Sequence, residues 1–140
     1  MRILGVDFGA SRTGIAVSDI LGMMAHGVTT VHSKSTREVA QRTADYAKEY
    51  SAGKIIVGLP KNMNNTIGER GEASVAFAGI LKQKTDCEII LWDERLSTVS
   101  ATRVLNETNT KGAKRKAVID TVAAEIILQN YLDFIMQNAE

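Results

Sequence analysis

This sequence has a single cysteine and almost no net charge, and each of these two shortages excludes classes of function. Cys87 is the single cysteine among 140 residues, which excludes an internal disulfide and a zinc site built from cysteines. It lies beside the apolar run 89–91, so we expect a partly buried free thiol rather than a nucleophile. The 17 Lys and Arg residues nearly balance the 16 Asp and Glu residues, which gives a formal net charge of +1. Any surface for a polyanion must therefore be local.

The sequence also lacks an apolar run of membrane length, and its first residues are typical of a folded strand rather than of a signal peptide. We therefore expect a cytoplasmic protein with no membrane partner. The length of 140 residues suits a single domain, residues 1–140. A domain of that size buries about 68–70% of its unfolded surface, so it needs no disulfide or metal to hold it together.

What the sequence does contain is an alternation of short β-branched runs with amphipathic segments. Three runs joined by short links open the chain, and links so short allow only antiparallel pairing. The later strands follow helices, and such crossovers make them parallel to the first strand. The pattern predicts strands at 2–9, 13–18, 23–31, 54–58 and 88–92, and helices at 37–50, 69–84, 93–106 and 116–136. This order favours an α/β fold with a mixed five-stranded sheet and helices on both faces.

The ends and faces of two of these helices can also be predicted. Ser35 or Thr36 is placed to cap the helix that starts near residue 37, and Gly53 stands at the usual stop position behind it. In the next helix, the apolar residues expected to be buried are Val75, Phe77, Ala78, Ile80 and Leu81.

Asp7 interrupts the first strand, an otherwise apolar run that is typical of the middle of a sheet. A charged group there is costly unless it is paired or holds a metal. The plainer alternative is an Asp that caps the turn from Phe8 to Arg12, a position where Asp is common. The positions of two other acids, Glu94 and Asp120, favour the functional interpretation.

Glu94 and Asp120 stand at element boundaries from which both could converge on Asp7. Glu94 follows the fifth strand, whose carboxyl end we expect beside that of the first strand; alternatively, it is a solvated acid next to Arg95. Asp120 shares a helical stripe with Ala124 and the apolar residues beyond it, so it should face the sheet. Its alternative role is a first-turn acid that favours the helix dipole.

Clustered carboxylates repel one another, and a hard divalent cation relieves that repulsion. Oxygen ligands without His or Cys favour Mg²⁺ or Mn²⁺. Asp7, Glu94 and Asp120 are therefore our candidate catalytic and metal-binding residues. Two such ions would activate a water and stabilise the leaving oxygen of a phosphodiester.

A basic run at 111–116 stands immediately before Asp120 and is expected to form a loop. Its residues Lys114, Arg115 and Lys116 are candidates to hold the phosphates of a polyanionic substrate, although a charge run is more often solvated surface. Asn64 belongs to the loop after the fourth strand, at the strand end where open α/β sheets bind ligands.

Five motifs together resemble the YqgF family of bacterial proteins, whose members are described as Holliday junction resolvase-like nucleases and as nucleases that mature the small-subunit ribosomal RNA precursor. The motifs are Gly5-Val6-Asp7-Phe8-Gly9, the segment 12–19, Val57-Gly58-Leu59-Pro60, the segment 93–98, and Asp120 with the residues that follow it to Gln129. The resemblance covers nearly the whole chain. One departure is Asn64-Asn65, where many relatives have Asp-Gly, and it leaves the role of this loop open.

The resemblance implies a ribonuclease H-like fold and a metal-dependent nuclease that acts on structured nucleic acid. Asp7, Glu94 and Asp120 match the family's acidic positions, and Arg12 matches a basic position near the site. The expected substrate is the ribosomal small-subunit RNA precursor, with junction DNA second. A non-catalytic RNA-binding assembly factor and a sugar-kinase-like ATPase lobe are the alternatives. We expect a monomer or a homodimer, since a junction resolvase needs two-fold symmetry.

Overall fold

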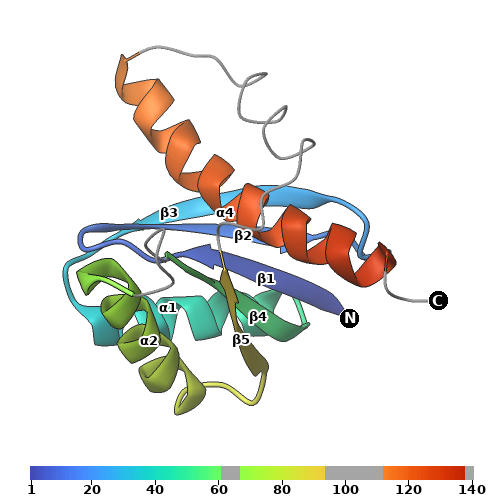
Figure 1. Ribbon diagram of the computed structural model, residues 1–140, viewed down its shortest axis with the longest axis horizontal. Helices are drawn as coiled ribbons and strands as arrows, with labels where there is room; N and C mark the ends of the chain where they lie inside the picture. Colours follow the sequence, from blue (N-terminus) through green and yellow to red (C-terminus); the bar gives the residue numbers. More distant parts are fainter. Residues whose placement is uncertain (61–66, 94–111, 138–140) are drawn as a thin grey trace.

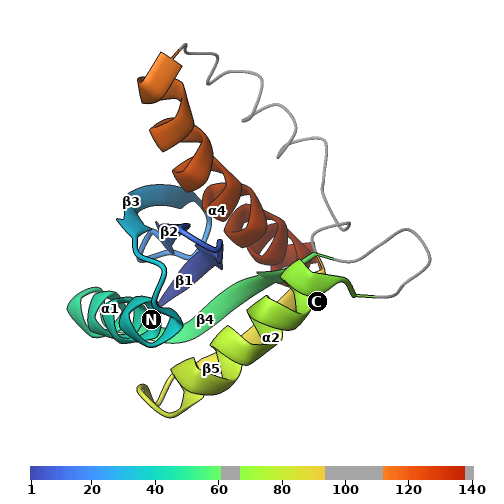
Figure 2. The same cartoon turned by 90° about the vertical axis from the view of Figure 1, so that its left-hand side faces the viewer.

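The computed structural model describes residues 1–60, 67–93 and 112–137, and at 112–120 it describes the backbone alone. These residues form a five-stranded sheet with helices on both faces (Figure 1, Figure 2). In chain order the elements are β1 Arg2–Asp7, β2 Arg12–Ser18, β3 Ala25–His32, α1 Thr36–Glu49, β4 Ala52–Leu59, α2 Glu69–Lys82, β5 Glu88–Asp93 and α4 Gly112–Gln137. The helix expected at 93–106 falls almost entirely outside the described residues.

The sheet has the strand order β3-β2-β1-β4-β5, with β1 at its centre. β1 and β2 are antiparallel, as are β2 and β3, whereas β4 runs parallel to β1 and β5 parallel to β4. The mixed sheet and the opening meander are therefore confirmed. Because β1, β4 and β5 run the same way, they end at one common edge, with Asp7, Leu59 and Asp93 as their last residues.

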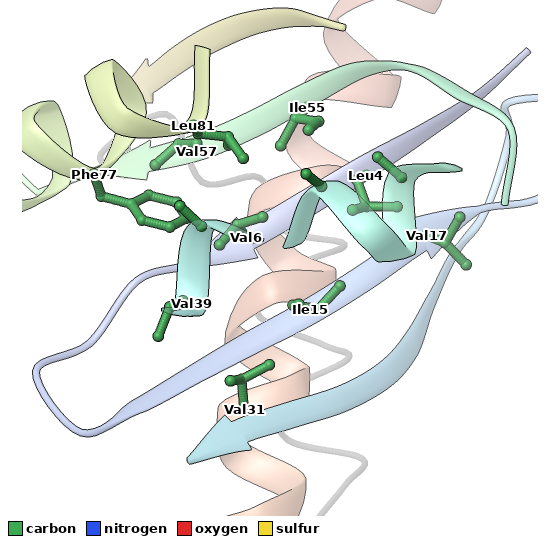
Figure 3. Close-up of a cluster of buried hydrophobic side chains, with 13 residues drawn as sticks. Leu4, Val6, Ile15, Val17, Val31, Val39, Ile55, Val57, Phe77 and Leu81 are labelled. Carbon is green, nitrogen blue, oxygen red and sulfur yellow. The ribbon is translucent and has the colours of Figure 1, made fainter. Parts of the chain in front are cut away.

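One face of the sheet carries the larger cluster of buried apolar side chains, which α1 and α2 cover (Figure 3). Leu4 and Val6 of β1 both enter this cluster, because alternate strand residues share a face. Phe77 and Leu81 reach the cluster from α2, as predicted. Burying a side chain of this size contributes about 1.5–3 kcal/mol, so these contacts are what hold the two helices on the sheet.

The buried face of α2 differs in part from its prediction. Val75 is 42% exposed, so its expected burial is wrong, and Ile80 is only partly buried. Gly71 and Ser74 are buried instead. These two small residues let the start of the helix approach its neighbours closely, which a count of apolar residues does not register.

α4 covers the opposite face of the sheet. Its apolar residues there, with their partners on β2 and β4, are Ala124, Ile127, Leu128, Tyr131, Leu132, Ala16 and Ile56. Gly5 of β1 makes the close approach: a Cβ on this residue would lie 2.6 Å from the Cβ of Leu128 and 3.0 Å from the carbonyl oxygen of Ala124. A glycine is therefore required for α4 to cross β1 at this depth.

The ends of α1 follow local chemistry. Ser35 is the N-cap, as predicted, and its Oγ accepts a hydrogen bond from the N–H of Glu38 at 3.2 Å. The predicted stop at Gly53 is wrong, because α1 ends at Glu49 and Gly53 belongs to β4. The chain leaves the helix through Ser51, whose φ of 54° is the one positive value at a non-glycine residue in the described part of the chain.

α4 differs from its prediction at its start. It begins at Gly112, four residues before the expected Lys116. The basic residues 114–116 therefore belong to a helix, and the expectation of a loop there is wrong. Lys and Arg are good helix formers, so their charge pattern was not a sign of a loop.

Across the described ranges, neither α4 nor any other helix is long and apolar enough to cross a membrane.

Candidate active site

Asp7 is the last residue of β1, at the edge where the parallel strands end. It pairs with Gly14 of β2. Asp7 is thus the last residue of a buried central strand, as predicted. Its side chain is 22% exposed, which leaves the carboxylate within reach of a ligand although most of it is covered. Strand alternation puts Asp7 on the same face as Ile3 and Gly5, which is the face that α4 covers.

Arg70 brings a positive charge to Asp7 from α2. Its Nη2 lies 4.0 Å from Oδ1 of Asp7, and its side chain is 70% exposed. Arg70 stands in the first turn of the helix that follows the loop after β4. Sequence reasoning missed this residue. The available signal was its place at the start of a helix reached from the carboxyl end of a parallel strand, where ligands commonly bind.

An aromatic stack joins the end of β1 to α2. Phe8 follows Asp7 directly, and its ring stacks on that of Phe77 with centroids 4.5 Å apart and 14° between the planes. Phe77 lies two helical turns beyond Arg70 on the same helix. The placement of Arg70 beside Asp7 is therefore supported by apolar packing as well as by the attraction of their charges.

The direction of α4 across the sheet is set by Gln129. Its Oε1 accepts a hydrogen bond from the N–H of Ala25 at 2.9 Å, and its Nε2 donates to the carbonyl of Met23 at 2.9 Å. Ala25 is the first residue of β3, at the edge opposite Asp7. Eight residues earlier on α4, Thr121 lies against Gly27 of β3, because a Cβ on that glycine would be 3.1 Å from the Cβ of Thr121. Going back along α4 from Gln129 to Thr121 therefore follows β3 away from Ala25, in the direction of the edge where Asp7 lies.

Asp120 stands about one helical turn before the contact of α4 with β1. Asp120 precedes Ala124, which abuts Gly5 of β1, by four residues, a rise of about 6 Å along the helix. Asp7 lies two residues beyond Gly5, about 6.6 Å along the strand. Because residues four apart share a helix face, Asp120 belongs to the stripe of α4 that crosses β1.

Glu94 lies outside the described residues, directly after Asp93 at the end of β5. The expectation that β5 ends beside β1 is wrong, because β4 lies between them. Two strand spacings, about 9.6 Å, separate the two strands at this edge. Strand order depends on how crossovers pack, and the local pattern of each strand does not contain that information.

The predicted acid trio stays a prediction. Within the described side chains, no three His, Cys, Asp or Glu residues are grouped to hold a metal ion. Those side chains do not include Asp120 or Glu94. The side chain of Asp7, which is 22% exposed, carries carboxylate oxygens, the donor chemistry that Mg²⁺ and Mn²⁺ prefer.

The structure describes some of the predicted phosphate-binding residues more fully than others. Arg12 is exposed and begins β2, so it lies at the same edge as Asp7. The basic residues 114–116 lie on the first turns of α4, before Asp120. Asn64 lies outside the described residues.

A cavity of about 730 Å³ lies at the opposite edge of the sheet, where α1 ends and β4 begins. Lys48, Lys84 and Cys87 are among the residues that line it. Cys87 is a partly buried free thiol, as predicted, and its Sγ donates a hydrogen bond to the carbonyl of Ala52 at 3.1 Å. Asp7 and Arg70 do not line this cavity, so we place the candidate site at the other edge.

Comparison with known sequences finds extensive similarity. A family model described as "RuvX: Holliday junction resolvase" matches residues 1–134. A protein of Clostridium novyi (strain NT) named "Putative pre-16S rRNA nuclease" is 50% identical over 135 residues, which are 96% of this chain and 100% of that protein. A protein of the same name from Bacillus cytotoxicus is 48% identical over 95% of this chain and 98% of its own length.

Comparison with solved structures concerns the fold alone, because the identities are low. A Thermus thermophilus RuvC in complex with a Holliday junction substrate has a TM-score of 0.64 at 15% identity, covering 98% of this chain and 96% of that one. A second structure of Thermus thermophilus RuvC has a TM-score of 0.63 at 12% identity, covering 99% and 97%. The expected ribonuclease H-like fold is confirmed by this likeness.

Proposed function

We propose that this chain, which belongs to the RuvX family of nucleases, cleaves phosphodiester bonds in the precursor of the small-subunit ribosomal RNA. The RuvX family is the same family as the YqgF family, which the sequence motifs resemble. The RNA substrate is the one printed in the names of relatives that match over almost their entire length. Such a substrate also implies action in the cytoplasm.

The observation that carries the proposal is the setting of Asp7. Its side chain is partly exposed at the end of the central strand, on the face covered by α4, and its Oδ1 lies 4.0 Å from a guanidinium nitrogen of Arg70. A charged group in that position is costly to bury without a partner or ligand. The edge combines an oxygen donor for a cation with basic groups for a polyanion, as hydrolysis of a phosphodiester requires.

We propose that Asp7, Glu94 and Asp120 together hold Mg²⁺ or Mn²⁺. The bound metal would supply activation of a water and stabilisation of the leaving oxygen. The stripe of α4 that runs from Ala124 back to Asp120 supports the participation of Asp120, since the same stripe abuts β1 at Gly5. The carboxylates of the three acids would supply the oxygen ligands, and the bound cation would relieve the repulsion among them.

The substrate backbone would be bound by basic and polar groups around this edge. Arg12 stands at the start of β2, beside the end of β1. The basic residues 114–116 lie near the beginning of α4, and Asn64 follows β4 in the chain. These residues would position the RNA through its phosphates, without selecting a base sequence.

The test is a cleavage assay on a panel that holds ribosomal precursor RNA, short RNA and four-way DNA junctions, with and without magnesium. We expect cleavage of the precursor to require magnesium or manganese and to stop in Asp7→Asn, while RNA binding survives. Asp86→Asn is the matched control, because Asp86 is exposed and lines the cavity at the opposite edge. Full cleavage in excess chelator, or by the Asp7→Asn protein, would refute the proposed site.

Junction DNA is the second candidate substrate. It is favoured by the description of the family model and by the fold shared with a RuvC bound to a junction. A resolvase must cut two strands related by two-fold symmetry, so this function predicts a homodimer, whereas the RNA nuclease could act as a monomer. Preferential cleavage of the junction in the same panel, by a protein that is dimeric in solution, would favour it over the RNA.

A further inference from the structure

Arg70 combines three properties that suit an arginine able to bind a ligand. Its guanidinium lies 4.0 Å from the carboxylate of Asp7, its side chain is 70% exposed, and it stands in the first turn of a helix at the edge where the central strands end. An ion pair this open and this long contributes little to stability. The arginine head group therefore remains free to form further hydrogen bonds on the solvent side.

The backbone of Arg70 is held firmly although its head group is exposed. Its carbonyl oxygen accepts a hydrogen bond from Oγ of Ser74 at 3.0 Å. The next residue, Gly71, is buried so closely that a Cβ would lie 2.7 Å from the Cβ of Ile67 and 2.9 Å from the carbonyl oxygen of Pro60. The exposed guanidinium therefore extends from a backbone position that packing and a hydrogen bond hold in place.

The charge of Arg70 suits a phosphate that approaches Asp7. A carboxylate and a phosphodiester repel each other at close range, and a cation beside both reduces that repulsion. The planar guanidinium can also donate two parallel hydrogen bonds to phosphate oxygens while its other donors remain near the carboxylate.

We propose that Arg70 binds the phosphate next to Asp7 and so positions the nucleic acid backbone for cleavage. This inference rests on the proposed nuclease function of the Asp7 edge. It adds to that site a substrate-positioning residue carried by α2, a helix to which the sequence motifs assigned no role. Arg70 thereby links the packing of α2 on the sheet to the placement of the scissile bond.

The binding test uses proteins that carry Asp7→Asn, which prevents cleavage, and a labelled fragment of ribosomal precursor RNA in a salt series with magnesium. Arg70→Gln is compared with Lys82→Gln, a loss of the same charge on the same helix about 18 Å away. We expect Arg70→Gln to lower the slope of log affinity against log salt by about 0.7–0.9 more than Lys82→Gln does. Equal slopes for the two variants would overturn the inference.

The kinetic test uses proteins with Asp7 intact. Arg70→Gln should lower kcat/KM on the same RNA about 10–100-fold relative to Lys82→Gln, the loss of one charge-assisted contact. Arg70→Lys should restore the salt slope but only part of kcat/KM, because an ammonium lacks the paired donors. Thermal melts accompany these measurements. The inference would be overturned if both Arg70 variants lost kcat/KM only in step with a lower melting temperature and bound RNA as tightly as Lys82→Gln does.

The two proposals can fail separately. If the native protein cleaves no nucleic acid in the panel, the proposed function fails, and the comparison of salt slopes still decides whether Arg70 binds phosphate. If the native protein cleaves RNA and the Arg70 and Lys82 variants are alike, the nuclease site stands and the role of Arg70 is refuted.

Discussion

Asp7 and Glu125 are both partly buried carboxylates, and the groups around each one determine how well its negative charge is stabilised. Asp7 lies at the sheet edge beside Arg70. Glu125 lies on α4 against β3, so close that a Cβ on Gly27 would be 2.6 Å from its Oε1. Burial raises the pKa of Glu125 above its ordinary value of 4.5, against smaller lowering effects from the N–H of Gly27 and from His26.

The raised pKa of Glu125 predicts how the stability of the protein changes with pH. An acid whose pKa is higher in the folded state binds its proton more tightly there, so its ionisation costs stability. This cost is absent below pH 4.5 and is complete once the pH exceeds the folded pKa. Glu125→Gln keeps an oxygen that can accept from Gly27, and it should therefore raise the melting temperature at pH 7 but not at pH 4. Melts across this range test it, and an equal difference at both pH values would contradict it.

At the scale of elements, the contact of α4 with β1 positions the helix stripe to which Asp120 belongs. Gly5 permits this contact because it has no side chain, and Ala124 and Leu128 occupy the space that a side chain would need. The helix stripe that touches Gly5 also includes the position of Asp120. The depth of this contact therefore links the packing of the fold to the geometry proposed for the site.

Gly5→Ala should push α4 away from the sheet and lower the free energy of unfolding by about 1–3 kcal/mol, the usual cost of overpacking. Gly79→Ala is the matched control. Gly79 is exposed within α2, and a Cβ there would meet no atom within 4 Å. Alanine in a helix should raise stability by about 0.5–1 kcal/mol at that position. Denaturant titrations of both variants measure the difference, and a Gly5→Ala protein as stable as the native one would show that α4 can shift without cost.

At the scale of the whole molecule, three separate segments supply groups to one edge of the sheet. β1 brings Asp7 and α2 brings Arg70, and we propose that Asp120 of α4 is the third contributor. If the acids form a shared metal site, their mutual repulsion must weaken the protein without metal. At an effective dielectric of about 20, such interactions are on the order of kcal/mol.

Asp7→Asn or Asp120→Asn should therefore raise the melting temperature in chelator, because each removes repulsion and keeps the side-chain volume. Magnesium should stabilise the native protein more than either variant, in proportion to the logarithm of its concentration over the dissociation constant. The advantage of the variants should shrink as magnesium is added. Melts across a magnesium series test this. Variants that melt below the native protein in chelator, with equal shifts in magnesium, would mean that no shared metal site exists.

Several features of this fold and site could be predicted because their causes are local. The short links after β1 and β2 allow only a meander, and the Ser35 cap depends on neighbouring backbone groups. The break in an apolar strand at Asp7 marks the candidate site in the same way, and the family motifs around it are continuous in the chain. Where the local signal was ambiguous, prediction failed: Gly53 was a plausible stop, yet Ser51 makes the turn after α1.

The sequence by itself determined the order of elements, the strand that carries Asp7, and the family to which the chain belongs. Only the tertiary structure decided that β4 separates β5 from β1, that α4 crosses β1 at Gly5, and that Arg70 lies beside Asp7. The reason is physical. Hydrophobic periodicity and turn chemistry act between residues close in the chain, whereas strand order and helix seating depend on packing between segments that are distant in sequence.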